Sequence, residues 1–417
     1  MITSNLRFVS NILIVVVVLQ LLVACSKRDT NITHVTFPAV SPPIQITNSE
    51  KEHLFASYYG INSWSQSQRY VTVLETSLKY NLPTKNDPAL LGMIDLESNN
   101  KFIPLAQTKA WNFQQGCMAH WLGSSPDSLI IYNDLRNGKF VSVIFNVHTK
   151  EEVKELPMPI SAVSPDGKKA ISINFSRLSI TRKGYGYAGN GQDAMNEIKY
   201  PDNDGLFMID LETGNFNLIV SIDQVKEIIH KPAGNDLVYF NHTLFSRDGN
   251  KIFWLARTLP NWGTTALTAN IDGTNIQRCF PEGWGGSHFD WLSDKQLMVT
   301  AKYEARQMAH ILFTIGDTTY KRLGKGLLDY DGHGTFSPDG KWMVTDTYPS
   351  ENREQKIYLM NMKSEAVFSL GRFYQPIEYS GDWRCDIHCR WSPKGDMIGF
   401  NSTHGGSRQV YILKLYK

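Results

Sequence analysis

The stretch His333-Gly-Thr-Phe-Ser-Pro-Asp-Gly340 decides the fold, because its frame recurs along the chain. In each copy an aromatic or aliphatic anchor residue precedes a short polar turn, and in the last four copies a histidine stands three residues before the anchor. The spacings between successive anchors are 57, 42, 82, 46, 45 and 55 residues, which bracket the period of four-stranded propeller blades. The anchors are Trp64, Trp121, Val163, Phe245, Trp291, Phe336 and Trp391.

The segments between the anchors favour strands. Short β-type runs such as residues 251–255 and 342–346 follow the turns, and no long amphipathic helix separates them. The turns Pro165-Asp-Gly167 and Pro338-Asp-Gly340 suit tight hairpins, because Pro fixes φ and Gly accepts a positive φ. We therefore predict an all-β, seven-bladed β-propeller. The alternative, a pair of β-sandwiches, would not predict seven copies.

The seventh copy has only three strands before the sequence ends at Lys417. A propeller closes its ring to remove exposed strand edges. We therefore expect a segment within residues 34–59 to supply the fourth strand of this blade, so that an N-terminal strand closes the ring.

The N-terminal residues predict an exported lipoprotein. Arg7 precedes an apolar run that is too short for a comfortable membrane span and well sized for a signal peptide, and Leu22-Val-Ala-Cys25 looks like a lipobox. We predict a signal peptide and lipobox over residues 1–25 with lipidation at Cys25, a flexible tether over 26–50 and the propeller over 51–417. The protein would then be lipid-anchored in the bacterial cell envelope, in the periplasm or at the outer-membrane surface. An uncleaved membrane anchor is the alternative.

Charge and cysteine content limit the partners. The chain has 417 residues, a formal net charge of +2 and a pI of about 8.1. Without a basic excess we expect no nucleic-acid partner, and contact with a membrane only through the N-terminal lipid. The cysteines other than Cys25 are compatible with disulfides in an oxidising compartment, but their spacing assigns no pairing. Cys385 and Cys389 flank His388 and could lend a thiolate to a metal, and the alternative for these two is a buried free thiol.

The four recurring histidines are candidate metal ligands. Equivalent positions of successive blades surround the central axis, so these rings should converge at one mouth of the channel. Clustered imidazoles suit a divalent metal, for which we consider Mn, Zn and Ca. The alternative is that each ring bonds a backbone carbonyl. The residues are His242, His288, His333 and His388, and the corresponding residues of the first three copies are Ile61, Met118 and Ile160.

Further polar residues are expected on the same rim. Arginine offers a planar fork for carboxylates, and aromatic rings stack on sugars. An insertion in the third copy adds Arg177, Arg182, Tyr185 and Tyr187, with Gly184 and Gly186 permitting close approach to a ligand. The substrate-binding candidates at the strand ends are Arg136, Arg257, Tyr303, Tyr348 and His404.

Several longer blocks resemble a known family. Gln115-Gly-Cys-Met-Ala-His-Trp-Leu122, Arg182-Lys-Gly-Tyr-Gly-Tyr187 and Trp383-Arg-Cys-Asp-Ile-His-Cys-Arg-Trp391 resemble TolB-like propellers of the oligogalacturonate lyase and ulvan lyase type, over roughly residues 55–417. The resemblance implies β-elimination on an acidic oligo- or polysaccharide that contains uronic acid.

Such a reaction needs a group that neutralises the uronate carboxylate, a base for the C5 proton and an acid for the departing O4. Arg177, Arg182 or a metal on the four histidines would neutralise the carboxylate, and Tyr187 or His120 would act as base or acid. The alternative function is a noncatalytic surface propeller that binds a glycan or a protein, since no Gly-x-Ser-x-Gly, Walker or His-Glu-x-x-His motif requires an enzyme.

Overall fold

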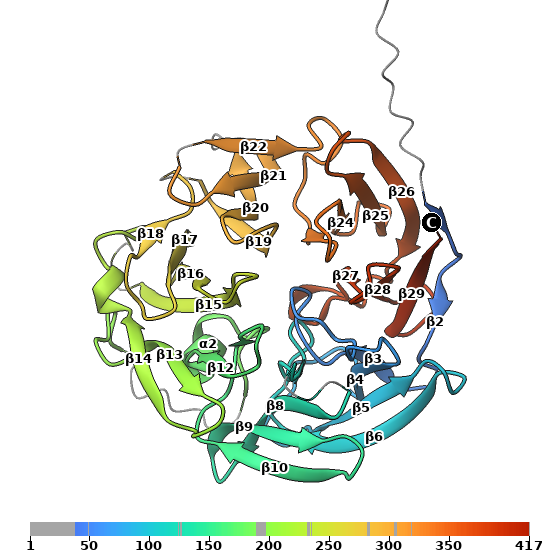
Figure 1. Cartoon of the computed structure of the whole chain (residues 1–417), viewed down its shortest axis with the longest axis horizontal. Helices are drawn as coiled ribbons and strands as arrows, with labels where there is room; N and C mark the ends of the chain where they lie inside the picture. Colours follow the sequence, from blue (N-terminus) through green and yellow to red (C-terminus); the bar gives the residue numbers. More distant parts are fainter. Residues whose placement is uncertain are drawn as a thin grey trace, which may run out of the picture. The chain divides into compact units, whose positions relative to one another are not determined.

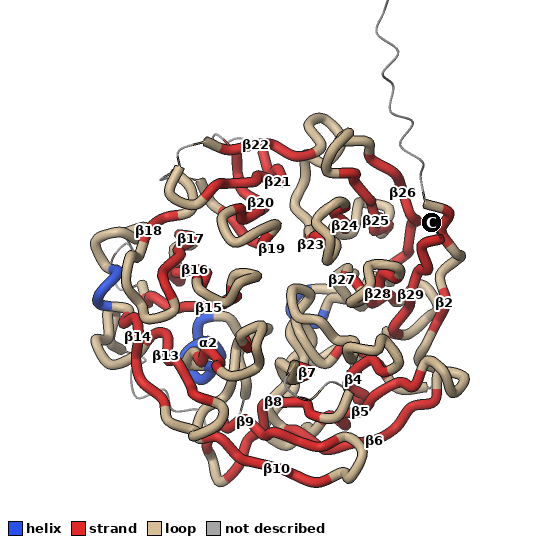
Figure 2. The backbone as a smooth tube through the Cα atoms, viewed as in Figure 1, coloured by secondary structure: helices blue, strands red, loops and turns tan. Residues whose placement is uncertain are grey.

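The computed structural model describes residues 38–416, apart from residues 49, 124, 126, 189–196, 232, 233, 235, 282, 283, 304–306 and 318. Two units are distinguished, residues 1–37 and residues 38–417, and the fold belongs to the second. Its sheets follow one another around a ring in chain order, as the colours in Figure 1 show. The strands dominate the tube in Figure 2, and the turns and loops connect them.

The first four blades are regular four-stranded antiparallel sheets. Blade 1 consists of β3 (Glu52–Phe55), β4 (Tyr70–Thr76), β5 (Ala89–Asp95) and β6 (Lys101–Thr108). Blade 2 consists of β7 (His120–Trp121), β8 (Leu129–Arg136), β9 (Lys139–Asn146) and β10 (Glu151–Leu156). Blade 3 consists of β11 (Ala162–Val163), β12 (Lys169–Ser172), β13 (Gly205–Asp210) and β14 (Phe216–Ser221). Blade 4 consists of β15 (Leu237–Phe245), β16 (Lys251–Leu259), β17 (Gly263–Asn270) and β18 (Gln277–Arg278).

Two further blades repeat this pattern, and the seventh joins residues from both ends of the described chain. Blade 5 consists of β19 (Gly286–Trp291), β20 (Gln296–Tyr303), β21 (Gln307–Thr314) and β22 (Tyr320–Leu323). Blade 6 consists of β23 (Thr335–Phe336), β24 (Trp342–Asp346), β25 (Glu354–Asn361) and β26 (Val367–Tyr374). Blade 7 consists of β27 (Arg390–Trp391), β28 (Met397–Ser402) and β29 (Gln409–Tyr416), with β1 (Ala39–Val40) and β2 (Ile44–Gln45) on its outer edge.

The closure of the ring confirms the expected use of an N-terminal segment. Ala39 pairs with Tyr416 and Ile44 pairs with Ile412, both antiparallel. The two strands that close the ring lie within the segment 26–50 that was predicted as a tether. The signal peptide, Cys25 and its lipid lie outside the described residues and stay predictions. Over the described part of the chain, no helix has the length and apolar content needed to cross a bilayer.

The recurring turns owe their shape to one hydrogen bond. In three copies the serine hydroxyl donates to the aspartate two residues later, at 2.6 Å from Ser164 to Asp166, 2.6 Å from Ser246 to Asp248 and 2.7 Å from Ser337 to Asp339. The glycine that follows takes a positive φ, 68° at Gly340, which side chains other than Gly rarely adopt. These turns define one rim of the ring, and the opposite rim carries the candidate site.

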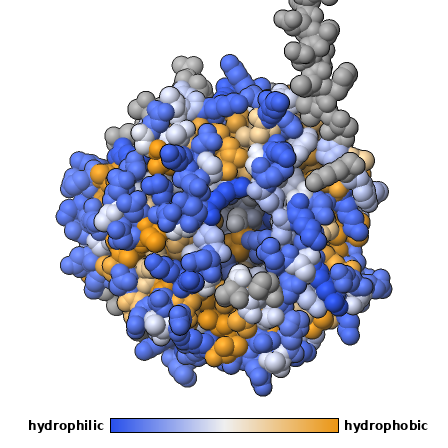
Figure 3. All heavy atoms as spheres, viewed as in Figure 1, coloured by the Kyte–Doolittle hydropathy of each residue, from blue (hydrophilic) through white to orange (hydrophobic). Residues whose placement is uncertain are grey.

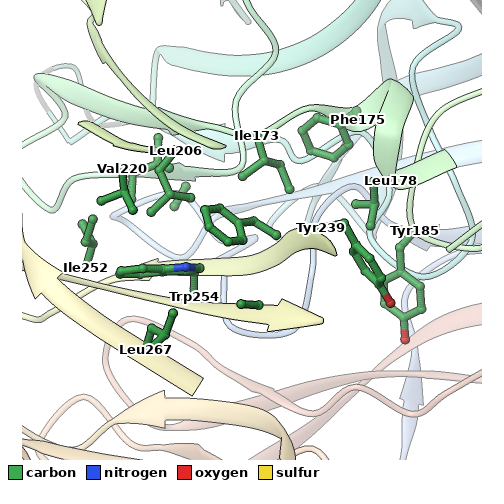
Figure 4. Packing of buried hydrophobic residues seen from close by; sticks show 14 of the residues in the cluster. Ile173, Phe175, Leu178, Tyr185, Leu206, Val220, Tyr239, Ile252, Trp254 and Leu267 are labelled. Carbon is green, nitrogen blue, oxygen red and sulfur yellow. The ribbon is translucent and has the colours of Figure 1, made fainter. Parts of the chain in front are cut away.

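Apolar side chains fill the spaces between neighbouring blades. In Figure 4, Trp254 of β16 lies among aliphatic side chains of blades 3 and 4, and Tyr185 and Tyr239 lie at one end of this cluster. Trp254 is fully buried. The insertion of blade 3 contributes a short helix, α2 (Phe175–Thr181), which begins after Asn174, whose side chain accepts a hydrogen bond from the Arg177 backbone N–H. The remaining short helical turns are η1 (Asp223–Val225) and η2 (Gly381–Trp383).

Candidate active site at one mouth of the ring

Local irregularities in the inner strands position the histidines. His242, His288 and His388 have positive φ values of 55°, 43° and 52°. The pairing of β15 with β16 shifts register between Asn241 and Leu244, and that of β19 with β20 shifts between Ser287 and Phe289. Such a bulge leaves one residue outside the ladder and redirects its side chain. Histidine adopts a positive φ more readily than most residues, so a histidine at this position of the repeat suits the bulged strand.

A pair of tyrosines occupies the centre of the histidine cluster. The Tyr58 ring stacks on His242 at 4.9 Å between centroids and contacts His388 at 5.3 Å. The Tyr59 ring contacts His288, His333 and His388, and its hydroxyl accepts a hydrogen bond from the Phe289 backbone N–H at 2.7 Å. The four histidines therefore do meet near the axis, around this pair. The space-filling view shows a hollow at the middle of the ring (Figure 3).

Two of the histidines form a compact group with an aspartate. One ligand atom from each of His333, Asp386 and His388 lies within 4.8 Å of the others, and all three residues are buried. His333 Nε2 and His388 Nε2 have no hydrogen-bond partner, whereas Asp386 forms an ion pair with Arg384, at 2.9 Å from Nε to Oδ1 and 2.8 Å from Nη2 to Oδ2. Buried polar atoms are rarely left unsatisfied. The group could therefore hold a metal ion.

Asp346 binds both histidines of this group, His333 through its ring and backbone and His388 through its backbone. Its Oδ1 accepts hydrogen bonds from His333 Nδ1 and from the His333 backbone N–H, both at 2.8 Å. Its Oδ2 accepts the His388 backbone N–H at 2.7 Å. Burial alone would lower the pKa of His333, but the Asp346 carboxylate outweighs it and raises that pKa, whereas burial holds the pKa of His388 well below its usual value. A carboxylate on Nδ1 leaves Nε2 available as a ligand atom.

His288 belongs to a different arrangement. Its Nδ1 lies 2.9 Å from Asp331 Oδ1, and its Nε2 lies 3.3 Å from the Tyr348 hydroxyl. Burial lowers the pKa of His288, so the ring is neutral near pH 7, with the Nδ1 proton donated to Asp331. Burial raises the pKa of Tyr348 well above its usual value, so its hydroxyl stays protonated. His288 Nε2 is thus an unprotonated, oriented acceptor at the mouth.

Two guanidinium groups lie beside the histidines without an acidic partner. Arg257 is buried, and its Nη2 donates to Gly286 O and Ser287 Oγ, whereas its Nε has no partner. Arg182 lies over the rings of Tyr185 and Trp262, 4.8 and 4.6 Å from their centroids, and its Nε is also unpartnered. Within the described residues, neither side chain forms an ion pair with a carboxylate. This pair is suited to bind an anion.

The remaining predicted residues lie in other surroundings. Tyr187 is buried in the core, where it stacks on Phe175 at 4.3 Å and its hydroxyl accepts from Asn133 at 2.9 Å. Arg177 is buried and donates to the carbonyls of Val238 and Ile198, which ties α2 to β15. His120 lines a cavity of about 580 Å³ that also contains the turn residues Pro165 and Pro338, so it faces the opposite mouth.

Some of the predicted substrate-binding residues lie in the site, and others lie elsewhere in the ring. Arg257 and Tyr348 lie in the site, as described above. Arg136 is paired with Asp134, Glu152 and Glu155 within blade 2. His404 packs on Phe373 of blade 6 and Tyr411 of blade 7, and the Tyr303 side chain lies outside the described residues. The cysteines at 117, 279, 385 and 389 are buried free thiols, the state expected as the alternative for the last two.

The insertion delivers Tyr185 to the site in addition to Arg182. The Tyr185 ring meets His242 edge-on at 5.3 Å. Gly184 and Gly186 allow close approach, but to the protein rather than to a ligand, because added Cβ atoms would lie 2.9 Å from Asp382 Oδ1 and 2.1 Å from the Ser179 backbone nitrogen. Sequence reasoning missed Asp386 and the Tyr58-Tyr59 pair as residues of the site. Asp386 stands two residues before His388, and this closeness in sequence could have indicated a second ligand beside that histidine.

Comparisons with known proteins agree with this architecture. An oligogalacturonate lyase in complex with manganese is 14% identical and superposes with a TM-score of 0.65, over 92% of this chain and 99% of that one. The chain has the fold of an oligogalacturonate lyase. The oligogalacturonate lyase of Vibrio parahaemolyticus, also 14% identical, superposes with a TM-score of 0.62 over 91% of this chain and 98% of that one.

Other comparisons add little. TolB of Acinetobacter baumannii is 15% identical and aligns over 84% of this chain and 82% of its own length, with a TM-score of 0.41. No protein-family model matches the sequence, and no curated protein does. At these identities the similarity to solved structures establishes the propeller fold, as the sequence blocks had predicted.

Proposed function

We propose that the protein is a polysaccharide lyase that cleaves a uronic-acid-containing oligosaccharide by β-elimination. The observation that carries this proposal is the combination of a buried group, His333, Asp386 and His388, whose two imidazole Nε2 atoms have no hydrogen-bond partner, with two guanidinium groups that have no acidic partner among the described residues. A uronate carboxylate is the substrate group that such a site fits. A propeller of the same fold has been solved as an oligogalacturonate lyase in complex with manganese, which supports the assignment.

The donor set suits a divalent transition metal. Two imidazole nitrogens and one carboxylate oxygen favour Mn²⁺ or Zn²⁺ over Ca²⁺, which prefers oxygen ligands throughout. His333, Asp386 and His388 would hold the ion, which when bound would withdraw charge from the substrate carboxylate and so acidify the neighbouring C5–H.

The residues of the chain itself account for the other requirements. Arg182 and Arg257 bind and orient the carboxylate of the sugar. His288 Nε2, unprotonated and aligned by Asp331, accepts the C5 proton. The electron pair of that C–H bond forms the C4–C5 double bond, the C4–O4 bond breaks, and the departing O4 is protonated by solvent at the mouth. These roles replace the base or acid role considered for Tyr187 and His120.

The test is a screen for unsaturated products. The protein is incubated with oligogalacturonates, a glucuronate-containing glycan and a neutral glycan, with Mn²⁺ or with chelator, and ultraviolet absorbance of the double bond is followed. We expect product only from uronate substrates, and a loss of about 100-fold or more in kcat for His288→Ala. His148→Asn, at an exposed histidine of blade 2, is the matched control and should retain full activity.

Two results would contradict the proposal. One is the absence of product from every uronate substrate in the presence of metal. The other is a His288→Ala variant as active as His148→Asn. Tight binding of uronates without product would instead favour the noncatalytic glycan-binding alternative.

A further inference from the structure

A second pocket lies next to the candidate active site on the same rim. It is bounded by the turn between β16 and β17, which carries Trp262, and by the segment before β19, which carries Trp284 and Gly285. β16 runs from the Ser246–Gly249 turn toward this rim, and β19 starts here and reaches His288 two residues later. The pocket has a volume of about 140 Å³. We call it the outer pocket.

Trp262 connects the outer pocket with the guanidinium pair. Its side chain is 52% exposed, yet the guanidinium carbons of Arg182 and Arg257 lie 4.6 and 5.3 Å from its ring centroid. The ring is therefore held in place by two cations while much of its surface meets solvent. An exposed, fixed indole offers an apolar platform on which the C–H face of a sugar ring can pack.

The polar part of the lining includes His230, Arg278 and Thr264. The Arg278 Nε donates to the Ile228 carbonyl, which fixes the position of the guanidinium. Trp284 provides a second aromatic wall, in contact with Phe313 and Tyr320. An aromatic cleft with a guanidinium group and hydroxyls fits a sugar that carries a carboxylate.

We propose that the outer pocket is a distal subsite, which binds the anionic sugar residue adjacent to the one whose carboxylate meets Arg182 and Arg257. This inference rests on the proposed lyase function and extends it. In a dimer the second sugar is the leaving group, attached through O4 of the sugar that meets Arg182 and Arg257. The outer pocket takes the neighbour on the other side, attached through C1, so only a trimer or longer oligomer reaches it. The enzyme therefore prefers trimers and longer oligomers to dimers.

Replacing Gly285 by a large residue should close the outer pocket. A Cβ built on Gly285 meets no atom within 4 Å, so Gly285→Trp adds an indole to the open space without a backbone clash. The matched control is Lys295→Trp, which places the same side chain at an exposed position on the opposite rim of blade 5. Trp284→Ala, which removes one wall, provides an independent second variant.

The experiment compares kcat/KM for di-, tri- and tetragalacturonate with Mn²⁺ present. We expect the wild type and Lys295→Trp to favour the trimer over the dimer by about tenfold, which corresponds to about 1.4 kcal/mol. Gly285→Trp should reduce this ratio to below about twofold while kcat/KM for the dimer stays the same. An unchanged ratio in Gly285→Trp, or an equal loss for every chain length, would overturn the proposal.

Direct binding separates this proposal from the lyase assignment. Titration calorimetry with trigalacturonate should show affinity about tenfold weaker for Gly285→Trp than for Lys295→Trp, whether or not the sugar is cleaved. If no product forms but this difference is present, the subsite stands and the lyase function fails. If the trimer binds both variants equally, the subsite is refuted even when cleavage is observed.

Discussion

Replacing Asp290 by Asn should stabilise the protein in a pH-dependent way. Asp290 lies in β19, two residues after His288, and borders the cavity at the mouth opposite the histidines. Its Oδ2 accepts the Phe336 backbone N–H at 2.7 Å, which joins blades 5 and 6. Burial raises the pKa of its carboxyl group to about 6, despite that hydrogen bond and the nearby Arg247. An asparagine keeps the acceptor and removes the charge.

The sign and size of the effect follow from linkage. The folded-state pKa is above the unfolded value, so ionisation of Asp290 destabilises the fold, and stability falls as pH rises from about 4 through 6. A difference of roughly two pKa units corresponds to about 3 kcal/mol at pH 8. Because the side chain keeps some contact with the cavity solvent, we expect about 2 kcal/mol in favour of Asp290→Asn at pH 8 and less than about 0.5 kcal/mol at pH 4.

Urea unfolding of the wild type and the variant at several pH values measures this difference. Asp294→Asn, at an exposed position in the next turn, serves as the control and should show no pH-dependent difference. A constant difference between wild type and Asp290→Asn from pH 4 to pH 8, or destabilisation at pH 8, would refute the reasoning. A constant difference would mean that the Asp290 carboxylate is already well solvated in the folded protein.

Three further predictions concern the metal group and the core. Asp346→Asn should weaken Mn²⁺ binding about 10- to 100-fold in a calorimetric titration, because Asp346 orients the His333 imidazole and holds the backbone of His388, and unchanged affinity would contradict this role. Mn²⁺ at 100 times its Kd should raise the free energy of unfolding by about 2.7 kcal/mol relative to chelated protein, and His333→Ala should abolish the increase in melting experiments. Trp254→Ala should cost about 3–5 kcal/mol in denaturant unfolding, whereas Phe216→Ala, at a half-exposed site, should cost less than about 1 kcal/mol.

The repeated frame predicted the ring and the meeting point of the histidines. Both follow from periodicity, because equivalent positions of successive blades must surround one axis. The need to pair the open edge of β29 predicted the N-terminal strand as well. Which imidazoles share a ligand site could not be predicted, because that depends on the loop that brings Asp386 beside His333, more than fifty residues away in sequence.

The insertion of blade 3 shows where local reasoning fails. Tyr185 and Tyr187 are two residues apart, and either could face the mouth. The packing of Gly186 against the backbone of α2 decides that Tyr185 reaches His242 and Tyr187 enters the core. Asn174 is a residue type that favours the start of a helix, but the seven residues that follow are too few to show a helical periodicity in the sequence.

The pairing of β1 with β29 in blade 7 imposes an order on folding. The Ser41 hydroxyl and the Lys414 backbone N–H that bonds to it are 373 residues apart in sequence. Bringing such distant segments together costs roughly 3 kcal/mol more chain entropy than closing a ten-residue loop. During synthesis β1 must therefore wait for nearly the whole chain, with its hydrogen-bonding groups unpaired. At high concentration, β1 of one molecule and β29 of another can meet first, and exchange of this strand between two copies is the expected misassembly.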